Sequence, residues 1–200
     1  MDAIYDAAFK ECGIIRAYTF DQLFDWCIAL ASQPLPKKRG TVIITNGGGA
    51  GVMATDACED WDVELMDIPE DLAEKFRKYM PPFGSTRNPI DLTGMATREK
   101  YEGATEEAFR DPRVGSVIVL YCHTAITDPM DVADGIISVV EKLKPDKPIT
   151  VSFIGGKETA EASDKLREHK IPCYPTPERA VAAMSSLYKR AKYLGVLAES

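Results

Sequence analysis

The sequence predicts a three-layer α/β domain built on a parallel sheet of about five strands. From Gly40 onward, short apolar runs rich in β-branched residues alternate with longer amphipathic segments. The short runs are apolar at consecutive positions, which is typical of strands covered on both faces. Their alternation with helices favours right-handed crossovers between parallel strands. With 200 residues, the chain has the length of one ordinary domain.

Each strand candidate is an apolar run bounded by turn-forming residues. The run TVIIT lies between a Pro/Lys-rich segment and the residues NGGG, and VGSVIVLY and PITVSF have the same character. Three shorter or less regular runs, VELMDI, NPIDL and IPCY, complete the set. The predicted strands cover residues 41–45, 63–68, 88–92, 114–121, 148–153 and 171–174.

The segments between the strands carry helix start and stop signals. Pro69 lies just inside a segment that a Pro-Pro pair ends after residue 80. The last helix has Thr176 as its cap and Pro177 at its first position. The predicted helices after the first strands begin at residues 69, 97, 128, 157 and 176.

Residues 1–39 are predicted to form a helical arm and linker in front of an α/β domain that covers residues 40–200. Two short helices are expected at about 3–10 and 19–31, followed by the linker PLPKKRG. Phe20, Phe24 and Trp26 make the second helix too apolar for a free tail. We therefore expect the arm to pack on the α/β unit or on a neighbouring domain.

Composition excludes several classes of protein. A formal net charge of −7 argues against a duplex-binding protein, which needs a basic face to displace counterions. No apolar run reaches the roughly 20 residues that span a bilayer, and Asp2 and Asp6 stand where a signal peptide carries basic residues. We expect a cytoplasmic protein that binds neither nucleic acid nor membrane.

The five cysteines are an odd number, lie far apart and form no CxxC pair. This spacing argues against a disulfide framework and against a structural zinc site. We therefore expect reduced and mostly buried thiols. Asp56, Glu59, Asp60 and Asp62 are interpreted as the solvated face of a helix, so no metal site is predicted.

Four glycine-containing or small polar turns follow predicted strands, and ligands of open parallel sheets bind beyond the carboxyl ends of the strands. The turns are NGGGAGVMATDA (46–57), DLTGMAT (91–97), YCHTAITDP (121–129) and FIGGKET (153–159). Glycine lets backbone N–H groups approach an anion, which the positive end of a helix dipole also favours. The first turn matches neither GxGxxG nor GK[ST], so it predicts no dinucleotide or Walker-type site. Each turn alone is explained by local structure, but four on one edge predict an anion site.

His123 follows a predicted strand and allows several interpretations. It suits a general base, a phosphate ligand or a phosphoryl carrier, and it equally suits a polar loop residue. Cys122 precedes it, but neighbours on a strand point to opposite faces. A Cys-His nucleophile pair is therefore not predicted.

Four segments of the sequence closely resemble the carboxyl-terminal ligase domain of the NDP-forming acyl-CoA synthetases, the ADP-forming acetate-CoA ligase type. They are TVIITNGGGAGVMATDA, PPFGSTRNPIDLTGMATREKYEGA, DPRVGSVIVLYCHTAITDP and VSFIGGKETAEASDKLREHKIPCYPTPERAVAAM. The same order is similar, more distantly, to the carboxyl-terminal domain of the succinyl-CoA synthetase beta subunit. In that comparison the NGAG, GGGAT and GGI loops of the relative correspond to residues 46–50, 93–97 and 124–126.

The resemblance implies a flavodoxin-like fold and a place in a three-step reaction. An acyl phosphate forms from acyl-CoA and phosphate, its phosphoryl group moves to a histidine, and the histidine passes it to ADP or GDP. The reverse direction makes acyl-CoA from an acid, CoA and a nucleoside triphosphate. Residue matching assigns the acyl and phosphate contacts to Asn46, Gly47, Gly48, Gly49, Gly94, Thr97, Thr124, Ala125 and Ile126, with the last three at a helix start.

The sequence also departs from a complete synthetase of this kind. The family's phosphorylated histidine belongs to an SHTG-type motif upstream of the segment that DAIYDAAFKECGIIR resembles, and that role is not transferred to His123. The expected partners are the CoA-binding and ATP-grasp domains of the same enzyme and a small carboxylate or phosphate. We expect an excised or separate domain that is inactive and cofactor-free alone, while the complete enzyme uses CoA, ATP or ADP, and Mg²⁺.

Two alternatives stay open at this point. The chain suits a stand-alone flavodoxin-like module that binds a small anion, or that docks on a partner through the face from Phe20 to Cys27. A flavin site is the weaker choice, because the loop after TVIIT lacks the hydroxyl-rich phosphate cradle that flavin binding uses.

Overall fold

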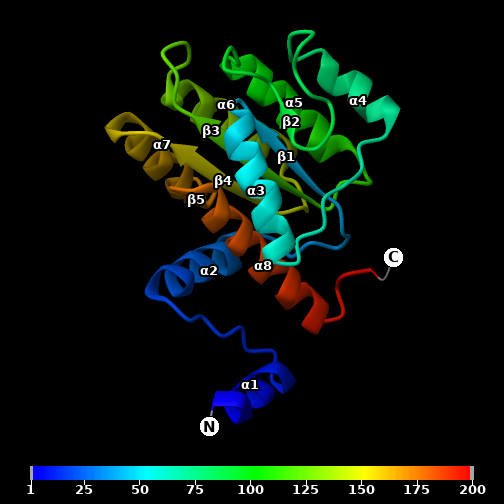
Figure 1. Ribbon diagram of the computed structural model, residues 1–200, viewed down its shortest axis with the longest axis vertical. Coiled ribbons are helices and arrows are strands. Elements are labelled where there is room, and N and C mark those ends of the chain that lie inside the picture. The colour runs from blue at the N-terminus through cyan, green and yellow to red at the C-terminus, as the bar shows by residue number, and fades with distance from the viewer. Residues whose placement is uncertain (1, 199–200) are drawn as a thin grey trace.

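A computed structural model describes residues 2–198 and contains one five-stranded sheet (Figure 1). The strands are all parallel and lie in the order β2-β1-β3-β4-β5. This is the flavodoxin-like order, as predicted. The strands are β1 (Thr41–Thr45), β2 (Ile90–Asp91), β3 (Ser116–Cys122), β4 (Ile149–Ile154) and β5 (Cys173–Tyr174).

Helices cover both faces of the sheet, and the described residues include no helix that is long and apolar enough to cross a membrane. The helices are α1 (Asp2–Glu11), α2 (Phe20–Ser32), α3 (Gly48–Asp60), α4 (Glu70–Arg77), α5 (Arg98–Arg110), α6 (Pro129–Leu143), α7 (Lys157–Glu168) and α8 (Pro177–Tyr193). One core cluster joins α4, α5, α6 and α7 to the sheet, and a second joins α2, α3 and α8 to the opposite face.

The central strands divide their side chains between these two cores. On β1, Val42 and Ile44 belong to the first core and Ile43 to the second. On β3, Val119 belongs to the first core and Leu120 to the second. Side chains alternate across a strand, so only a strand buried on both sides needs apolar residues at consecutive positions. This explains why the consecutive apolar pattern correctly predicted a parallel sheet.

The predicted strand at residues 63–68 is wrong. That segment touches the sheet through a single bridge between Leu65 and Thr41. The next position along that edge of β1 is already taken, because the Asn88 side chain accepts from the Ile43 N–H at 2.9 Å and donates to the Thr41 carbonyl at 2.7 Å. β2 then pairs with the end of β1. The same side chain explains why β2 is shorter than the predicted strand at 88–92.

The second arm helix, α2, packs against α8, and a part-buried ion pair joins the two helices. The Asp25 carboxylate is buried and accepts from the Arg179 guanidinium through Nε at 2.7 Å and Nη2 at 2.8 Å. The Tyr174 hydroxyl donates to the Asp25 carbonyl. Trp26 and Ala29 pack into the core beside these groups. The arm therefore packs on the α/β unit through α2, whereas α1 buries no residue.

The thiols differ from expectation on the arm. Cys58 and Cys173 are buried, and burial raises the pKa of Cys58 to about 12 and that of Cys173 to about 11. Cys122 is half-buried. Cys12 and Cys27, however, are exposed. The prediction of mostly buried thiols fails there because Cys12 follows α1, which buries no residue, and Cys27 lies on a side of α2 that does not face the second core.

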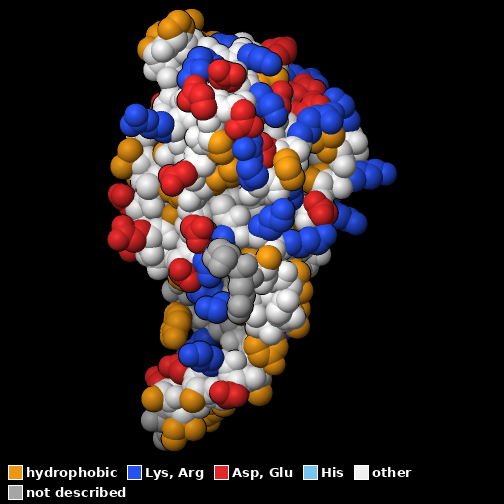
Figure 2. All heavy atoms as spheres, turned by 90° about the vertical axis from the view of Figure 1, so that its right-hand side faces the viewer, with side chains coloured by type: hydrophobic (Ala, Val, Ile, Leu, Met, Phe, Trp, Pro, Cys, Tyr) orange, Lys and Arg blue, Asp and Glu red, His pale blue; other side chains and the backbone are white. Residues whose placement is uncertain are grey.

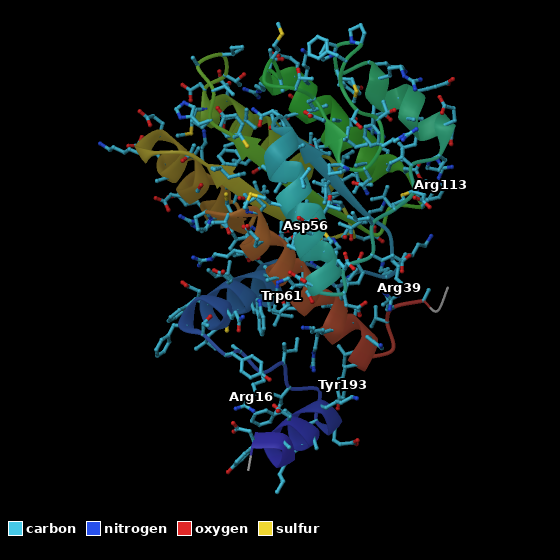
Figure 3. The ribbon with its side chains drawn as sticks, viewed as in Figure 1. Arg16, Arg39, Asp56, Trp61, Arg113 and Tyr193 are labelled. Atoms are coloured by element: carbon cyan, nitrogen blue, oxygen red, sulfur yellow. The ribbon has the colours of Figure 1, made fainter. Side chains whose placement is uncertain are left out.

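Arg113 is expected to make stability depend on acid pH (Figure 3). Its guanidinium bonds Asp111, whose side chain is only 2% exposed, and also Asp71, and it holds the pKa of both carboxyls below their usual value. A lowered folded-state pKa gives stability that is present above the unfolded value near pH 4 and is lost as pH falls through the folded value. Arg113→Met is expected to lower the thermal midpoint at pH 7 by about 2–4 °C.

The difference between Arg113→Met and the unsubstituted protein should shrink below pH 4, as measured by thermal unfolding across pH 2.5 to 7. Arg77→Met is the matched control, because among residues 2–198 Arg77 pairs only with the exposed Glu70. A constant difference at all pH values would contradict the linkage.

Candidate functional site

The four turns that follow the strands meet at the carboxyl ends of the strands, as the sequence predicted. This end is the top of the molecule in Figure 1, where α3 begins. A Cβ atom built on Gly47 would lie 2.7 Å from the Cys122 sulfur, and one on Gly155 would lie 2.8 Å from the His123 Cβ. One on Gly94 would lie 4.0 Å from the Thr124 methyl. We call residues 46–51, 91–97, 122–128 and 155–159 the rim.

The glycine-rich segment after β1 is a helix start rather than a loop. Gly47 is the N-cap of α3, and Gly48 is the first helical residue. The Gly47 N–H donates to the Thr45 hydroxyl at 3.0 Å, and Gly51 makes the first turn's bond back to the Gly47 carbonyl. Within residues 2–198, the N–H groups of Gly48 and Gly49 have no acceptor. Both glycines are exposed, so these two donors are available to a ligand.

Asn46 does not face outward. Its side chain is buried, accepts from the Cys122 N–H at 2.7 Å and donates to the Cys122 carbonyl at 2.9 Å. This pair of bonds joins the end of β1 to the end of β3. The Asn46 amide therefore holds two turns together. The sequence signal for this role was only the position of an asparagine directly after a strand.

Replacing Asn46 by alanine is expected to loosen the rim. The change removes the Asn46 partner from the part-buried N–H and carbonyl of Cys122, which costs about 1–3 kcal/mol. Thermal unfolding should show the loss, and alkylation of the half-buried Cys122 should become faster. Asn46→Asp keeps an acceptor for the Cys122 N–H but places a carboxylate oxygen against the Cys122 carbonyl and buries a charge, so it should be destabilised at least as much as Asn46→Ala. Equal unfolding midpoints for all three proteins would exclude this role.

The turn at residues 91–97 is strained. Thr93 has a φ of +68°, a conformation that is unusual for a β-branched residue. The Asp91 carboxylate accepts from the Thr93 N–H at 2.8 Å and stabilises the turn. Thr97 occupies the N-cap of α5, but its hydroxyl donates to the Glu99 carboxylate instead of capping the helix. Gly94 lies beside Thr124, so this turn forms the wall next to the third turn.

The third turn differs from the expectation that residues 124–126 start a helix. α6 begins at Pro129, and Asp128 caps it by accepting from the Met130 N–H at 2.8 Å. Thr124, Ala125 and Ile126 therefore precede the helix, because a cap followed by proline at the first position sets the start further along the chain. The Thr127 hydroxyl donates to the Ala96 carbonyl, which joins this loop to the second turn.

The electrostatics of the rim single out the start of α3. The Asp128 carboxylate already occupies the start of α6. α3 has no side-chain cap and no acidic residue in its first turn. Its dipole and its two free N–H groups therefore favour a bound anion. Asp91 borders this place, since a Cβ on Gly48 would lie 3.2 Å from its Oδ2 atom.

The rim contains little nucleophilic chemistry of its own. Burial, and then the charge of Asp91, raise the pKa of Cys122, so its thiol stays protonated at neutral pH. His123 is exposed, and its backbone N–H donates to the Ile154 carbonyl. Among residues 2–198, no group of three His, Cys, Asp or Glu side chains could hold a metal ion. The rim is suited to binding and orienting an anion.

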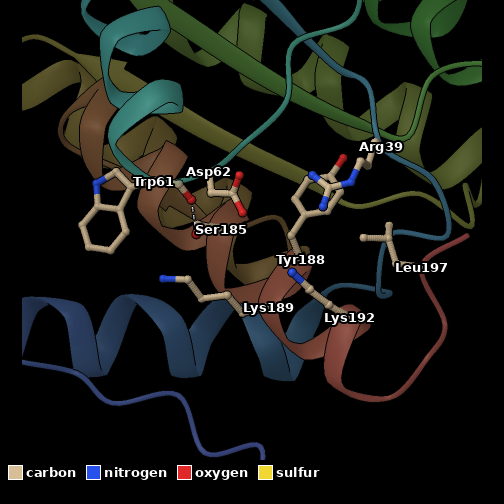
Figure 4. Close-up of a pocket in the computed structure, with 8 residues that line it drawn as sticks. All are labelled: Arg39, Trp61, Asp62, Ser185, Tyr188, Lys189, Lys192 and Leu197. Carbon is tan, nitrogen blue, oxygen red and sulfur yellow. Dashed lines mark hydrogen bonds between the residues drawn. The ribbon is translucent and has the colours of Figure 1, made fainter. Parts of the chain in front are cut away.

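A cavity at the opposite end of the sheet does not compete with the rim. It lies between α8 and the end of α3 and is lined by residues that include Arg39, Trp61 and Tyr188 (Figure 4). The Ser185 hydroxyl donates to the Trp61 carbonyl beside it. Its volume is about 30 Å³, which holds one or two water molecules but no phosphate ester.

Comparisons with known proteins agree with the resemblance of the four segments. The family described as "Ligase-CoA domain" matches residues 41–198. The alpha subunit of acetate-CoA ligase [ADP-forming] I from Pyrococcus furiosus is 50% identical over 96% of this chain, which covers 41% of that subunit. The beta subunit of succinate-CoA ligase [ADP-forming] from Desulfurococcus amylolyticus is 34% identical over 53% of this chain and 27% of its own length.

A solved structure matches almost the whole chain. It is the dinucleotide forming acetyl-coenzyme A synthetase 1 of Ca. Korarchaeum cryptofilum in complex with phosphate and ADP, with a TM-score of 0.93 and 44% identity. The match covers 98% of this chain and 42% of the solved chain. The chain therefore spans less than half the length of these relatives.

Proposed function

Because the chain belongs to the Ligase-CoA domain family, we propose that it is the domain of an NDP-forming acyl-CoA synthetase that forms part of the acyl and phosphoryl site. The overall reaction is acid + CoA + ATP = acyl-CoA + ADP + phosphate, through an acyl phosphate and a phosphohistidine. The observation that carries the proposal is the start of α3, where Gly48 and Gly49 offer two free N–H groups at the rim.

The contribution of this chain is electrostatic. The amides of Gly48 and Gly49 and the α3 dipole stabilise negative charge on an acyl phosphate or phosphoryl group without reorganising. We assign Gly94, Thr97 and the loop at residues 124–126 to the wall that limits the size of the acyl group, since Gly94 and Thr124 are neighbours on the rim. The histidine that carries the phosphoryl group comes from another part of the enzyme, and His123 is not assigned that role.

The remaining chemistry is assigned to the other domains. The described residues offer no carboxylate cluster for Mg²⁺, so we place the metal and the nucleotide in the ATP-grasp domain. CoA is assigned to the CoA-binding domain. The phosphate and ADP in the Korarchaeum complex support these ligand classes for the complete enzyme.

A domain exchange tests the proposal. The matched stretch of the Pyrococcus furiosus alpha subunit is replaced by this chain, and the chimera is assembled with the rest of that ligase. We expect ADP-forming acetate-CoA ligation and a labelled phosphohistidine, whereas the isolated 200 residues should show neither.

Two results would count against the proposal. A folded chimera without ligation or histidine labelling would favour a stand-alone anion-binding or docking module instead. Sustained CoA-dependent ATP consumption by the isolated chain would show that the chain needs no partner domains.

A further inference from the structure

The arm carries an apolar surface that the described residues leave open. Its large side chains are between 45% and 80% exposed, and Phe20 is the most exposed of them. We call this surface the arm face, and it consists of Tyr5, Ile14, Tyr18, Phe20, Leu23 and Phe24. Figure 2 shows the arm as a narrow lobe below the body with hydrophobic side chains on it. A contiguous apolar patch on a globular protein indicates an interaction site.

The geometry of α2 indicates that this surface is built to pack. Trp26 and Ala29 face the second core, whereas Phe20, Phe24 and Cys27 follow one another at helical spacing on a different side. α2 therefore has two apolar stripes, and only one of them has a partner within residues 2–198. Aromatic side chains such as tyrosine and phenylalanine are enriched at the cores of protein interfaces.

Open space accompanies the arm face. An open surface groove with a volume of about 520 Å³ lies between the end of α1 and the start of α2, lined by Phe9, Tyr18 and Phe20 among others. A second open groove, of about 480 Å³, lies between α1 and the end of α8, where Tyr193 lines it. Both grooves are open to solvent and therefore accessible to side chains of another chain.

The arm is nevertheless held in a defined place. Arg16 pairs with Asp6 at 2.7 Å and with Asp2 at 3.3 Å, and these ion pairs anchor α1 to the segment that joins α1 to α2. The ring of Tyr193 lies against Gly13, where a Cβ atom would approach it to 2.3 Å (Figure 3). Gly13 has a φ of +67° and tolerates this contact because it lacks a side chain. These contacts hold α1 in place relative to α8, so the groove between the two helices is part of the folded structure.

The arm belongs to the longer relatives as well as to this chain. The Ligase-CoA domain family begins at residue 41, after the arm. The Korarchaeum structure matches 98% of the chain with a TM-score of 0.93, so the match includes the arm. This chain covers 42% of that solved chain. The arm is thus shared with proteins that have more than half of their length outside the matched stretch.

We propose that the arm face is the surface on which the rest of the synthetase chain docks on this domain, with apolar side chains of that chain inserted beside α1 and α2. This inference rests on the proposed function, and it assigns a contact at the opposite end of the molecule from the rim. The rim receives the phosphoryl chemistry, whereas the arm face holds the domains together.

Cys27 provides a native probe, because it is exposed on the same stripe as Phe20 and Phe24. Its alkylation rate is measured in the isolated chain and in the chimera with the Pyrococcus furiosus subunit. We expect labelling at least tenfold slower in the chimera, and rapid labelling again in a Phe20→Ser/Phe24→Ser chimera. The control is Phe83→Ser, because Phe83 is 74% exposed but lies outside the arm. It should leave Cys27 protected.

Several outcomes would overturn the docking proposal. Equal Cys27 rates in the isolated chain and the chimera would show that nothing covers the arm face. Concentration-dependent protection in the isolated chain would identify a second copy as the occupant. The isolated chain should also enhance the fluorescence of an apolar dye at least twofold more than its Phe20→Ser/Phe24→Ser variant, and equal signals would exclude an accessible apolar face.

Ligation by the chimera separates this proposal from the proposed function. Protected Cys27 without ligation or histidine labelling would leave the docking surface in place and remove the function. Full ligation with an unprotected Cys27 would remove the docking surface and leave the proposed function in place.

Discussion

Replacing Gly47 by alanine is expected to lower ligation by the chimera about 100-fold, because displacing a binding group by about 1 Å can cost that much. The added Cβ would lie 2.7 Å from the Cys122 sulfur and 3.2 Å from its Cβ. Gly47 has a φ of −134°, which alanine adopts without strain, so the effect is a steric one. Rotation of the Cys122 side chain relieves the contact with the sulfur but not the 3.2 Å contact with its Cβ, so we expect the start of α3 to move away from β3 together with the two free amides of Gly48 and Gly49. Steady-state kinetics of the chimera measure the loss.

The fold should survive the Gly47→Ala change. Local overpacking costs about 1–3 kcal/mol, which a domain of this size tolerates. The isolated variant should therefore retain its circular dichroism spectrum and unfold cooperatively at a somewhat lower temperature. Normal ligation by a folded Gly47→Ala chimera would mean that the start of α3 does not contribute to the site.

Replacing Gly115 by alanine is expected to produce the largest loss of stability. A Cβ atom there would lie 2.2 Å from the Lys38 carbonyl oxygen and 2.6 Å from that of Arg39. Both atoms are backbone, and the Gly115 N–H also donates to the Gly40 carbonyl at 2.8 Å, so no side chain can rotate away. We expect a cost of about 3 kcal/mol, which corresponds to a thermal midpoint lower by about 6–12 °C.

Gly49→Ala is the matched control for Gly115→Ala in thermal unfolding. A Cβ on Gly49 meets no atom within 4 Å, and Gly49 lies in the first turn of α3. Alanine in a helix is favoured over glycine by about 0.5–1 kcal/mol, so this midpoint should stay the same or rise. Similar midpoints for the two variants would show that the linker before β1 moves aside without cost.

The sequence predicted the main elements because their signals are local. TVIIT carries in consecutive residues the information that a strand is buried on both faces, and Thr176 with Pro177 specifies a helix start. The four turns could be assigned to one edge because parallel strands all end on the same side of a sheet. The order of motifs was sufficient to identify the family.

The errors arose where a distant residue decided the outcome. Residues 63–68 look like a strand, but the Asn88 side chain takes their place beside β1. The ligand contact of Asn46 stays a prediction, but the structure adds a role that the sequence did not show, because the Asn46 amide bonds the backbone of Cys122. In both cases the bonded partner is 20 or more positions away, and no pattern within one segment reports it.

By itself, the sequence determined the layered α/β class, the parallel sheet, the family and the segments that surround the rim. These follow from apolar periodicity, cap residues and motif order, which are properties of neighbouring positions. Only the tertiary structure decided which backbone amides stay free and which apolar stripe of α2 stays uncovered. Both depend on where other segments come to rest, since a hydrogen-bond donor or an apolar face is available only when no other part of the folded chain has already taken it.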